Sequence, residues 1–294
     1  GSAVAKENAA AALWNLAVNA DNQVAIAQAG GIAPLVELTR SGSAEAKEKA
    51  AGALRTLAVN DDNKVAIAQA GGIAPLVELT RSGSAVAKEN AAGALWNLAV
   101  NDDNSVAIAQ VGGIAPLVEL TRSGSAVAKE NAAAALWNLA VNADNQVAIA
   151  QAGGIAPLVE LTRSGSAEAK EKAAGALRTL AVNDDNKVAI AQAGGIAPLV
   201  ELTRSGSAVA KENAAGALWN LAVNDDNSVA IAQVGGIAPL VELTRSGSAG
   251  AKENAAAALW NLAMNADNKV AIARAGGIAP LVELTRSGSA EAKE

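Results

Sequence analysis

The sequence contains no histidine, cysteine, tyrosine or phenylalanine, and it has a single methionine. Without histidine or cysteine, the chain lacks an imidazole base, a thiol nucleophile and the common ligands of zinc. We therefore expect no enzyme activity, no metal site and no cofactor. The absence of cysteine fits both a reducing compartment and a designed protein. Localisation thus stays open, cytoplasmic for a natural protein and undefined for a recombinant one.

Basic runs and long apolar runs are missing as well. The formal net charge is −6, and the only aromatic residues are five tryptophans. A protein that binds nucleic acid needs clustered basic charge and often stacking aromatics, so we expect no nucleic-acid partner. No apolar run approaches the ~20 residues that cross a bilayer, and no signal peptide opens the sequence. We therefore expect no membrane partner.

What the sequence has in abundance is alanine and a repeat. Hydrophobic residues make up 51% of the chain, and most of them are alanine, which has the highest helix propensity. The run GGIAPLVELTRSGS occurs seven times with a period of 41 residues. We expect a single solenoid domain, 1–294, because no unit can bury its apolar faces alone. Its units are 1–41, 42–82, 83–123, 124–164, 165–205, 206–246 and 247–287, followed by a partial eighth, 288–294.

The repeats are copied without drift. Residues 1–123 and 124–246 are identical. Natural repeats usually drift at exposed positions, where substitutions cost little. The identity therefore favours engineering over a very recent duplication.

Each period predicts three helices and no strand, because apolar residues recur at helical spacing and none alternate with period two. The first helix of unit two is predicted to start near Asp62, with Asp61 and Asp62 capping its amino end. Gly71 and Gly72 are predicted to end it, since glycine tolerates the left-handed conformation at a helix exit.

The second and third helices follow directly. The second is predicted to open with Pro75, where a missing N–H costs nothing, and to point Leu76, Val77 and Leu79 inward. The third helix is the longest, with Ser84 as its cap and an end near position 100.

The sequence resembles the armadillo repeat family on two segments that recur, unchanged or with one or two substitutions, in all seven units. These are AQAGGIAPLVELTRSGS, with its glycine break, and ALWNLAVN in the third helix. The resemblance covers the whole chain. It implies an all-α, armadillo-type, right-handed solenoid of three-helix, 41-residue repeats, whose third helices line a concave groove. The related HEAT repeat fits less well, because it lacks the short first helix and the glycine pair.

The resemblance also implies a function. Family members that bind extended peptides use an asparagine on each third helix to hold the main chain of the ligand. A side-chain amide both donates and accepts, so it can satisfy an extended backbone. The NLA segments place these ladder asparagines at Asn15, Asn97, Asn138, Asn220 and Asn261. Two units carry Thr56 and Thr179 instead, which we expect to be weaker rungs.

The tryptophans depart from the pattern of importin-like members, which place an aromatic residue four positions before the ladder asparagine. Here that position holds only alanine or glycine, so the resemblance does not extend to clamps for basic side chains. The tryptophans immediately precede the asparagine, about 100° around the helix. They are predicted either to pack against a neighbouring repeat or to contact a ligand. They are Trp14, Trp96, Trp137, Trp219 and Trp260.

Two units carry a coordinated set of three changes in the third helix. Asn8, Trp14 and Asn15 of the first unit are replaced in the second unit by Lys49, Arg55 and Thr56. Their counterparts in the fifth unit are Lys172, Arg178 and Thr179. The substitutions indicate either basic sites for acidic ligand side chains or a change made for solubility.

We therefore predict a module that binds an extended peptide or protein segment in its groove. The alternative is a structural scaffold, or a solenoid that self-associates head to tail, with no dedicated ligand. Self-association is suggested by the two ends of the sequence, since a third helix opens it and a first and second helix close it.

Overall fold

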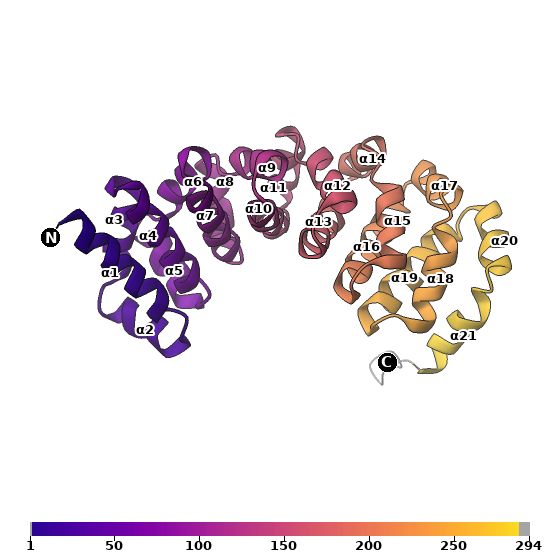
Figure 1. Cartoon of the computed structure of the whole chain (residues 1–294). Helices are drawn as coiled ribbons and strands as arrows, with labels where there is room; N and C mark the ends of the chain where they lie inside the picture. The colour runs from indigo at the N-terminus through magenta and orange to yellow at the C-terminus, as the bar shows by residue number, and fades with distance from the viewer. Residues whose placement is uncertain (1, 288–294) are drawn as a thin grey trace. The chain divides into compact units, whose positions relative to one another are not determined.

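The computed structural model describes residues 2–287 and shows an all-α chain without a strand in that part. Three kinds of helix alternate, as Figure 1 shows. The first helices are α2 (Ala20–Gln28), α5 (Asp61–Gln69), α8 (Asp102–Gln110), α11 (Ala143–Gln151), α14 (Asp184–Gln192), α17 (Asp225–Gln233) and α20 (Ala266–Arg274). The second helices are α3 (Ile32–Ser41), α6 (Ile73–Ser82), α9 (Ile114–Ser123), α12 (Ile155–Ser164), α15 (Ile196–Ser205), α18 (Ile237–Ser246) and α21 (Ile278–Ser287). The third helices are α1 (Ala3–Leu16), α4 (Ala44–Leu57), α7 (Ala85–Leu98), α10 (Ala126–Leu139), α13 (Ala167–Leu180), α16 (Ala208–Leu221) and α19 (Ala249–Leu262).

The helices form two compact units, residues 1–157 and 158–294. Inside each unit, helices of one kind pack against the next helix of the same kind: α1 on α4, α4 on α7 and α7 on α10 in the first, α13 on α16 and α16 on α19 in the second. The predicted all-helical solenoid of three-helix repeats is therefore confirmed. The assignment of 1–294 to a single domain stays a prediction.

The core of each repeat lies between its second and third helices. Leu76, Val77 and Leu79 of α6 are buried, as predicted, and so are Leu95 and Leu98 of α7. Alanines that are fully buried on the third helices let these helices approach one another closely. The apolar periodicity of the sequence thus predicted correctly which faces are inside.

The ends of the helices agree with the prediction only in part. Ser84 caps α7, its hydroxyl accepting a hydrogen bond from the Ala87 N–H at 3.2 Å, and Gly71 takes the left-handed conformation with φ +72°. The cap predicted at Asp61 and Asp62 is wrong, because the side chain of Asn60 accepts from the Asn63 N–H. The second helix begins at Ile73 rather than at proline, since a proline without an N–H fits anywhere in the first turn.

Asp61 has a different role in the first turn of α5. Its carboxylate accepts a hydrogen bond from the buried Lys64 ammonium and forms an ion pair with it. The hydrogen bond, and then the charge of Lys64, hold the pKa of Asp61 below its ordinary value of 3.8. The pKa of Asp184 is lowered in the same way by Lys187.

We predict that NMR titration will find Asp61 and Asp184 protonating below pH 3.8. Because these pKa values are depressed in the folded state, the associated stability is present above the unfolded pKa and is lost as pH falls through the folded one. In the Lys64→Met variant, the pKa of Asp61 should rise while that of Asp184 stays in place. An unchanged Asp61 would contradict the role given to Lys64.

Within residues 2–287, no helix is long and apolar enough to cross a bilayer. The same part of the chain holds no cluster of three or more potential metal ligands.

Candidate peptide-binding surface

The predicted site residues all lie on the third helices. In the first unit these residues come from α1, α4, α7 and α10, and in the second unit from α13, α16 and α19. Because consecutive third helices pack directly on each other within a unit, equivalent residues form rows across them. We call the side that carries the ladder asparagines the third-helix surface.

The ladder asparagines are fixed by a hydrogen bond that the sequence did not predict. Nδ2 of Asn97 donates to the main-chain carbonyl of Arg55 on the preceding third helix at 2.9 Å. Nδ2 of Asn138 donates to the carbonyl of Trp96 at 3.1 Å. In the second unit the same bonds join Asn220 to Arg178 O at 2.9 Å and Asn261 to Trp219 O at 3.1 Å. Each amide is therefore held in one orientation by the repeat before it.

Three members of the predicted row do not form this hydrogen bond to a preceding third helix. The hydroxyl of Thr56 donates to the carbonyl of Gly52 in its own helix, and that of Thr179 donates to the carbonyl of Gly175, both at 3.1 Å. Neither threonine bonds the preceding repeat through its hydroxyl. Asn15 on α1 is exposed. The row of oriented amides thus consists of two consecutive members in each unit.

Trp14 packs against the next repeat, where a glycine on the next third helix makes room for its indole. The indole of Trp14 lies so close to Gly52 that a Cβ on this glycine would be 2.6 Å from the ring. Trp14 is nevertheless half-exposed, and the ammonium of Lys49 lies 5.8 Å from the ring centroid, a cation–π distance. Both predicted roles, packing and a face open to ligand, are therefore compatible with the geometry. Trp260 on α19 is 68% exposed.

Arginine takes the place of tryptophan in two repeats. The side chain of Arg55 lies against Gly93, where a Cβ would be 2.6 Å from Nε, and Arg178 lies against Gly216 in the same way. Nη2 of Arg178 reaches to 3.5 Å from Oδ1 of Asn254, two third helices further on. Glycine in the middle of a helix costs about 0.5–1 kcal/mol relative to alanine, and the close approach of these side chains explains that cost.

The carboxylates next to this surface already have partners. In most repeats, the serine before the third helix donates to a glutamate on the third helix before it. Ser84 thus bonds Glu48 at 2.7 Å, and Ser248 bonds Glu212 at 3.0 Å. Arg55 and Lys49 form no ion pair with any residue in the described part of the chain. The basic groups are thus uncompensated by nearby carboxylates.

A second row of asparagines was missed from the sequence. Asn90, Asn131, Asn213 and Asn254 are buried, and each Nδ2 donates to a main-chain carbonyl of the preceding third helix. They lie seven residues before the ladder asparagines, on the same helix face. The recurrence of Asn at both positions was the signal. A sequence does not show, however, which main-chain carbonyl on a neighbouring helix a side chain will bond.

A stack of three-helix repeats with main-chain-bonded third helices defines the chain as an α-solenoid. The profile of the family described as "Armadillo/beta-catenin-like repeat" matches residues 19–59, 60–100, 101–141, 142–182, 183–223 and 224–264. The chain therefore belongs to the armadillo repeat family. Its family repeats start at the first helix, 18 residues after the predicted units but with the same period. This family is typically a non-enzymatic binding module, and no catalytic family is indicated.

Several solved structures are similar to this chain, and they are engineered proteins. One engineered protein has a TM-score of 0.91 and 35% identity, covering 99% of this chain and 73% of that one. A protein described as computationally designed for modular peptide recognition has a TM-score of 0.72 and 27% identity, covering 78% and 99%. A designed armadillo repeat protein in complex with the peptide (KR)4 has a TM-score of 0.71 and 25% identity, covering 79% and 99%. No curated protein matches the chain.

Proposed function

We propose that this protein binds an extended peptide along its third-helix surface and holds the peptide main chain with the ladder asparagines. The observation that carries the proposal is the hydrogen bond that fixes each ladder amide. One N–H of Asn97 is used by the carbonyl of Arg55, while Oδ1 and the second N–H have no partner in the described part of the chain. Each side chain therefore offers one acceptor and one donor in a fixed direction.

The spacing of these amides also suits an extended chain. Packed helices lie about 8–10 Å apart, and an extended peptide advances about 3.3 Å per residue. Neighbouring rungs thus correspond to roughly two or three peptide residues. Because the amides are held before the ligand arrives, little side-chain entropy is lost on binding.

The side-chain preference follows from the repeats that carry arginine. Arg55 stands beside Asn97, which bonds its carbonyl, so a peptide held by Asn97 passes the guanidinium. With the nearby glutamates engaged by serines, a carboxylate on the peptide is the natural partner for Arg55 and Lys49. We propose the same preference at Arg178, which lies in the second compact unit, residues 158–294. The complex with (KR)4 belongs to a different protein, and alanine or glycine stands here at the positions of aromatic clamps.

We infer that the protein is a binding module and not an enzyme, with no cofactor. Two similar structures support this: a protein designed for peptide recognition and another with a bound peptide. A structural scaffold without a ligand is the alternative outcome of the experiment below.

The test is a screen of a random peptide library against three forms of the protein. The ladder variant carries Asn→Ala at Asn97, Asn138, Asn220 and Asn261. The matched control carries Asn→Ala at Asn90, Asn131 and Asn213, which removes hydrogen bonds between the same kind of helix. It leaves Asn254 in place, because Asn254 also contacts Arg178 of the binding surface. Both variants are weakened in stability, but only the ladder variant loses groups that touch the peptide.

We predict that peptides selected by the parent bind the control about as tightly and the ladder variant at least ~30-fold more weakly. This estimate assumes ~0.5–1.5 kcal/mol per lost hydrogen bond over two rungs with two bonds each. Equal losses in both variants would show that the asparagines act on stability alone. If no form selects a peptide, the chain is better described as a scaffold.

A further inference from the structure

One contact recurs between successive repeats throughout the chain. The arginine near the end of each second helix donates from Nη2 to the carbonyl of the first glycine in the next glycine pair. The distances are 2.8–3.0 Å. The pairs are Arg40–Gly71, Arg81–Gly112, Arg122–Gly153, Arg163–Gly194, Arg204–Gly235 and Arg245–Gly276.

The acceptor and the donor of this hydrogen bond each occur once more, without a partner in the part of the chain that the structure describes. Nothing lies within 4 Å of the place where a Cβ on Gly30 would be, whereas Arg40 Nη2 lies 2.7 Å from that place on Gly71. The corresponding arginine of α21 is Arg286, which is exposed. An acceptor before α3 and a donor on α21 are therefore the two parts of one recurring bond.

The apolar side chains near these two groups are also exposed, whereas their equivalents in the inner repeats are buried. Ile278 and Val282 on α21 are 62% and 43% exposed, while their equivalents on α18, Ile237 and Val241, are 6% and 1% exposed. On the α1–α3 side, Leu16 is 51% exposed, and its equivalent Leu57 is fully buried. Pro34 is exposed as well, although prolines at this position in the inner repeats are buried.

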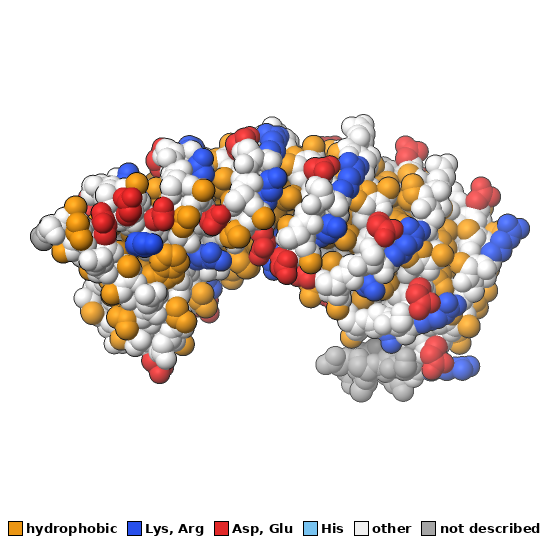
Figure 2. Space-filling model, in the orientation of Figure 1, with side chains coloured by type: hydrophobic (Ala, Val, Ile, Leu, Met, Phe, Trp, Pro, Cys, Tyr) orange, Lys and Arg blue, Asp and Glu red, His pale blue; other side chains and the backbone are white. Residues whose placement is uncertain are grey.

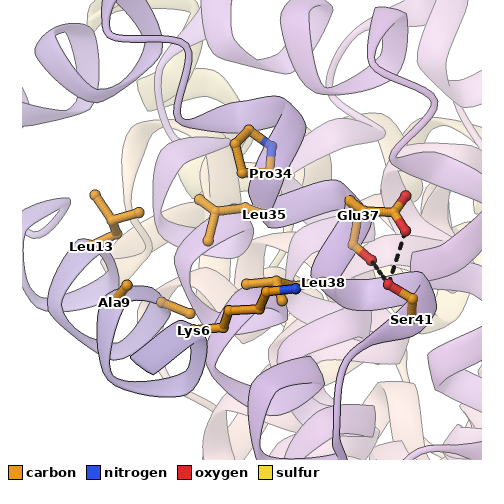
Figure 3. Close-up of a pocket in the computed structure, with 9 residues that line it drawn as sticks. Lys6, Ala9, Leu13, Pro34, Leu35, Glu37, Leu38 and Ser41 are labelled. Carbon is orange, nitrogen blue, oxygen red and sulfur yellow. Dashed lines mark hydrogen bonds between the residues drawn. The ribbon is translucent and has the colours of Figure 1, made fainter. Parts of the chain in front are cut away.

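A groove of about 260 Å³ between α1 and α3 marks the place that a second helix fills in the other repeats (Figure 3). Lys6, Ala9 and Leu13 of α1 line one side, and residues of α3 line the other. Figure 2 shows hydrophobic side chains at the surface over α1 and α2. One repeat further on, α3 packs against both α4 and α6, and the equivalent leucines Leu54 and Leu76 are fully buried.

The helix that would fit this groove is present elsewhere in the chain. α21 and α3 have the same sequence, IAPLVELTRS. Its open apolar face and its arginine are the groups that α3 uses toward α4, α6 and Gly71. The occupant is thus specified by an interface that the chain already forms between its own repeats.

We propose that α21 of one molecule packs into the groove between α1 and α3 of a second molecule, so that chains of these 294 residues associate head to tail. Arg286 of one molecule then donates to the carbonyl of Gly30 in the other. Trp260, 68% exposed on α19, packs against Ala11 of the second molecule, as Trp14 does against Gly52. The contact joins unlike surfaces, so it continues into fibres or closes into rings.

Two half-blocked variants test the proposal by light scattering. Ile278→Asp blocks α21, and Pro34→Asp blocks the groove; both side chains are exposed, so the fold tolerates the changes. Each variant alone is expected to keep the mass of one chain, 29.0 kDa, at every concentration. Their mixture is expected to form a complex of twice that mass, because one open end of each remains. The parent should grow further with concentration.

The control is Val59→Asp, at a valine that is 62% exposed and lies outside both surfaces. It should associate like the parent. A mixture of the half-blocked variants that stays at the mass of one chain overturns the proposal. So does a parent that remains monomeric at every concentration, or growth that persists in Ile278→Asp alone.

Discussion

Exchanging Arg55 and Arg178 for glutamate is expected to turn a preference for acidic peptide side chains into a preference for basic ones. Each guanidinium lies half-buried on the third-helix surface against a glycine of the next repeat. Hydrogen bonds to a charged partner contribute about 1.5–3 kcal/mol, which corresponds to ~10–150-fold in Kd at each site. The reversed charge repels the former ligand, and its affinity should fall by at least this factor.

The measurement compares two peptides that differ only in Asp or Lys at the position facing Arg55, at about 0.15 M salt. Because both arginines are partly open to solvent, the difference should shrink as salt is raised. The charge control is Lys269→Glu with Arg274→Glu, two exposed residues of α20 away from the third-helix surface. It changes the net charge by the same amount and should leave the ratio of the two affinities unchanged.

The chain also supplies a control for the fold. Replacing Lys49, Arg55 and Thr56 by Asn, Trp and Asn recreates the combination that stands in the 41-residue repeats 1–41 and 83–123. Gly93 can receive the new tryptophan, since Gly52 already receives Trp14. This variant should bind peptide with an added rung and without a charge preference at the peptide position that faces residue 55. If the parent does not distinguish Asp from Lys, the basic residues serve solubility instead.

The repeat made most of the fold predictable from the sequence. Glycine at a helix exit, serine before the third helix and apolar residues at helical spacing are local signals, and Gly71, Ser84 and Leu76 followed them. The cap of α5 was mispredicted because asparagine and aspartate are equally good caps. Only the local backbone decides that Asn60 accepts from Asn63 while Asp61 bonds Lys64.

The candidate site was less predictable, because it depends on contacts between repeats. The sequence placed the ladder asparagines on one helix face, but it did not show that Asn97 bonds the repeat before it. It indicated a close contact at Gly52, but it did not show that the contacting side chain is that of Trp14. Such contacts depend on the offset between neighbouring helices, which small rotations set and which the period of a repeat leaves undetermined.

The glycine pairs allow a second large effect to be predicted, because the two members of a pair are needed for different reasons. Gly112 has φ +73°, and the nearest atom to a Cβ there would be Arg81 Nη2 at 3.4 Å, an ordinary contact. Gly113 has an ordinary φ of −74°. A Cβ on it would lie 2.8 Å from the carbonyl oxygen of Ile108 and 3.0 Å from Val77 of the preceding repeat.

We therefore expect alanine and asparagine to rank in opposite order at the two positions. At Gly112, alanine should lower the free energy of unfolding by about 1–2 kcal/mol through backbone strain. Asparagine, which tolerates the left-handed region, should cost less there. At Gly113, alanine should cost about 1–3 kcal/mol through overpacking. Asparagine should cost more at this position, because it adds volume and buries an amide.

Urea unfolding followed by circular dichroism measures all four variants, with the midpoint as the main readout because repeat arrays depart from two-state behaviour. The same ranking at both positions would mean that a single cause, strain or crowding, acts on the whole pair. The opposite ranking would show that Gly112 ends the first helix, while Gly113 sets how closely the second helix of one repeat approaches that of the repeat before. That approach brings Arg81 within reach of the Gly112 carbonyl, so the loss of stability at Gly113 reports the strength of the stacking between repeats on which the third-helix surface is built.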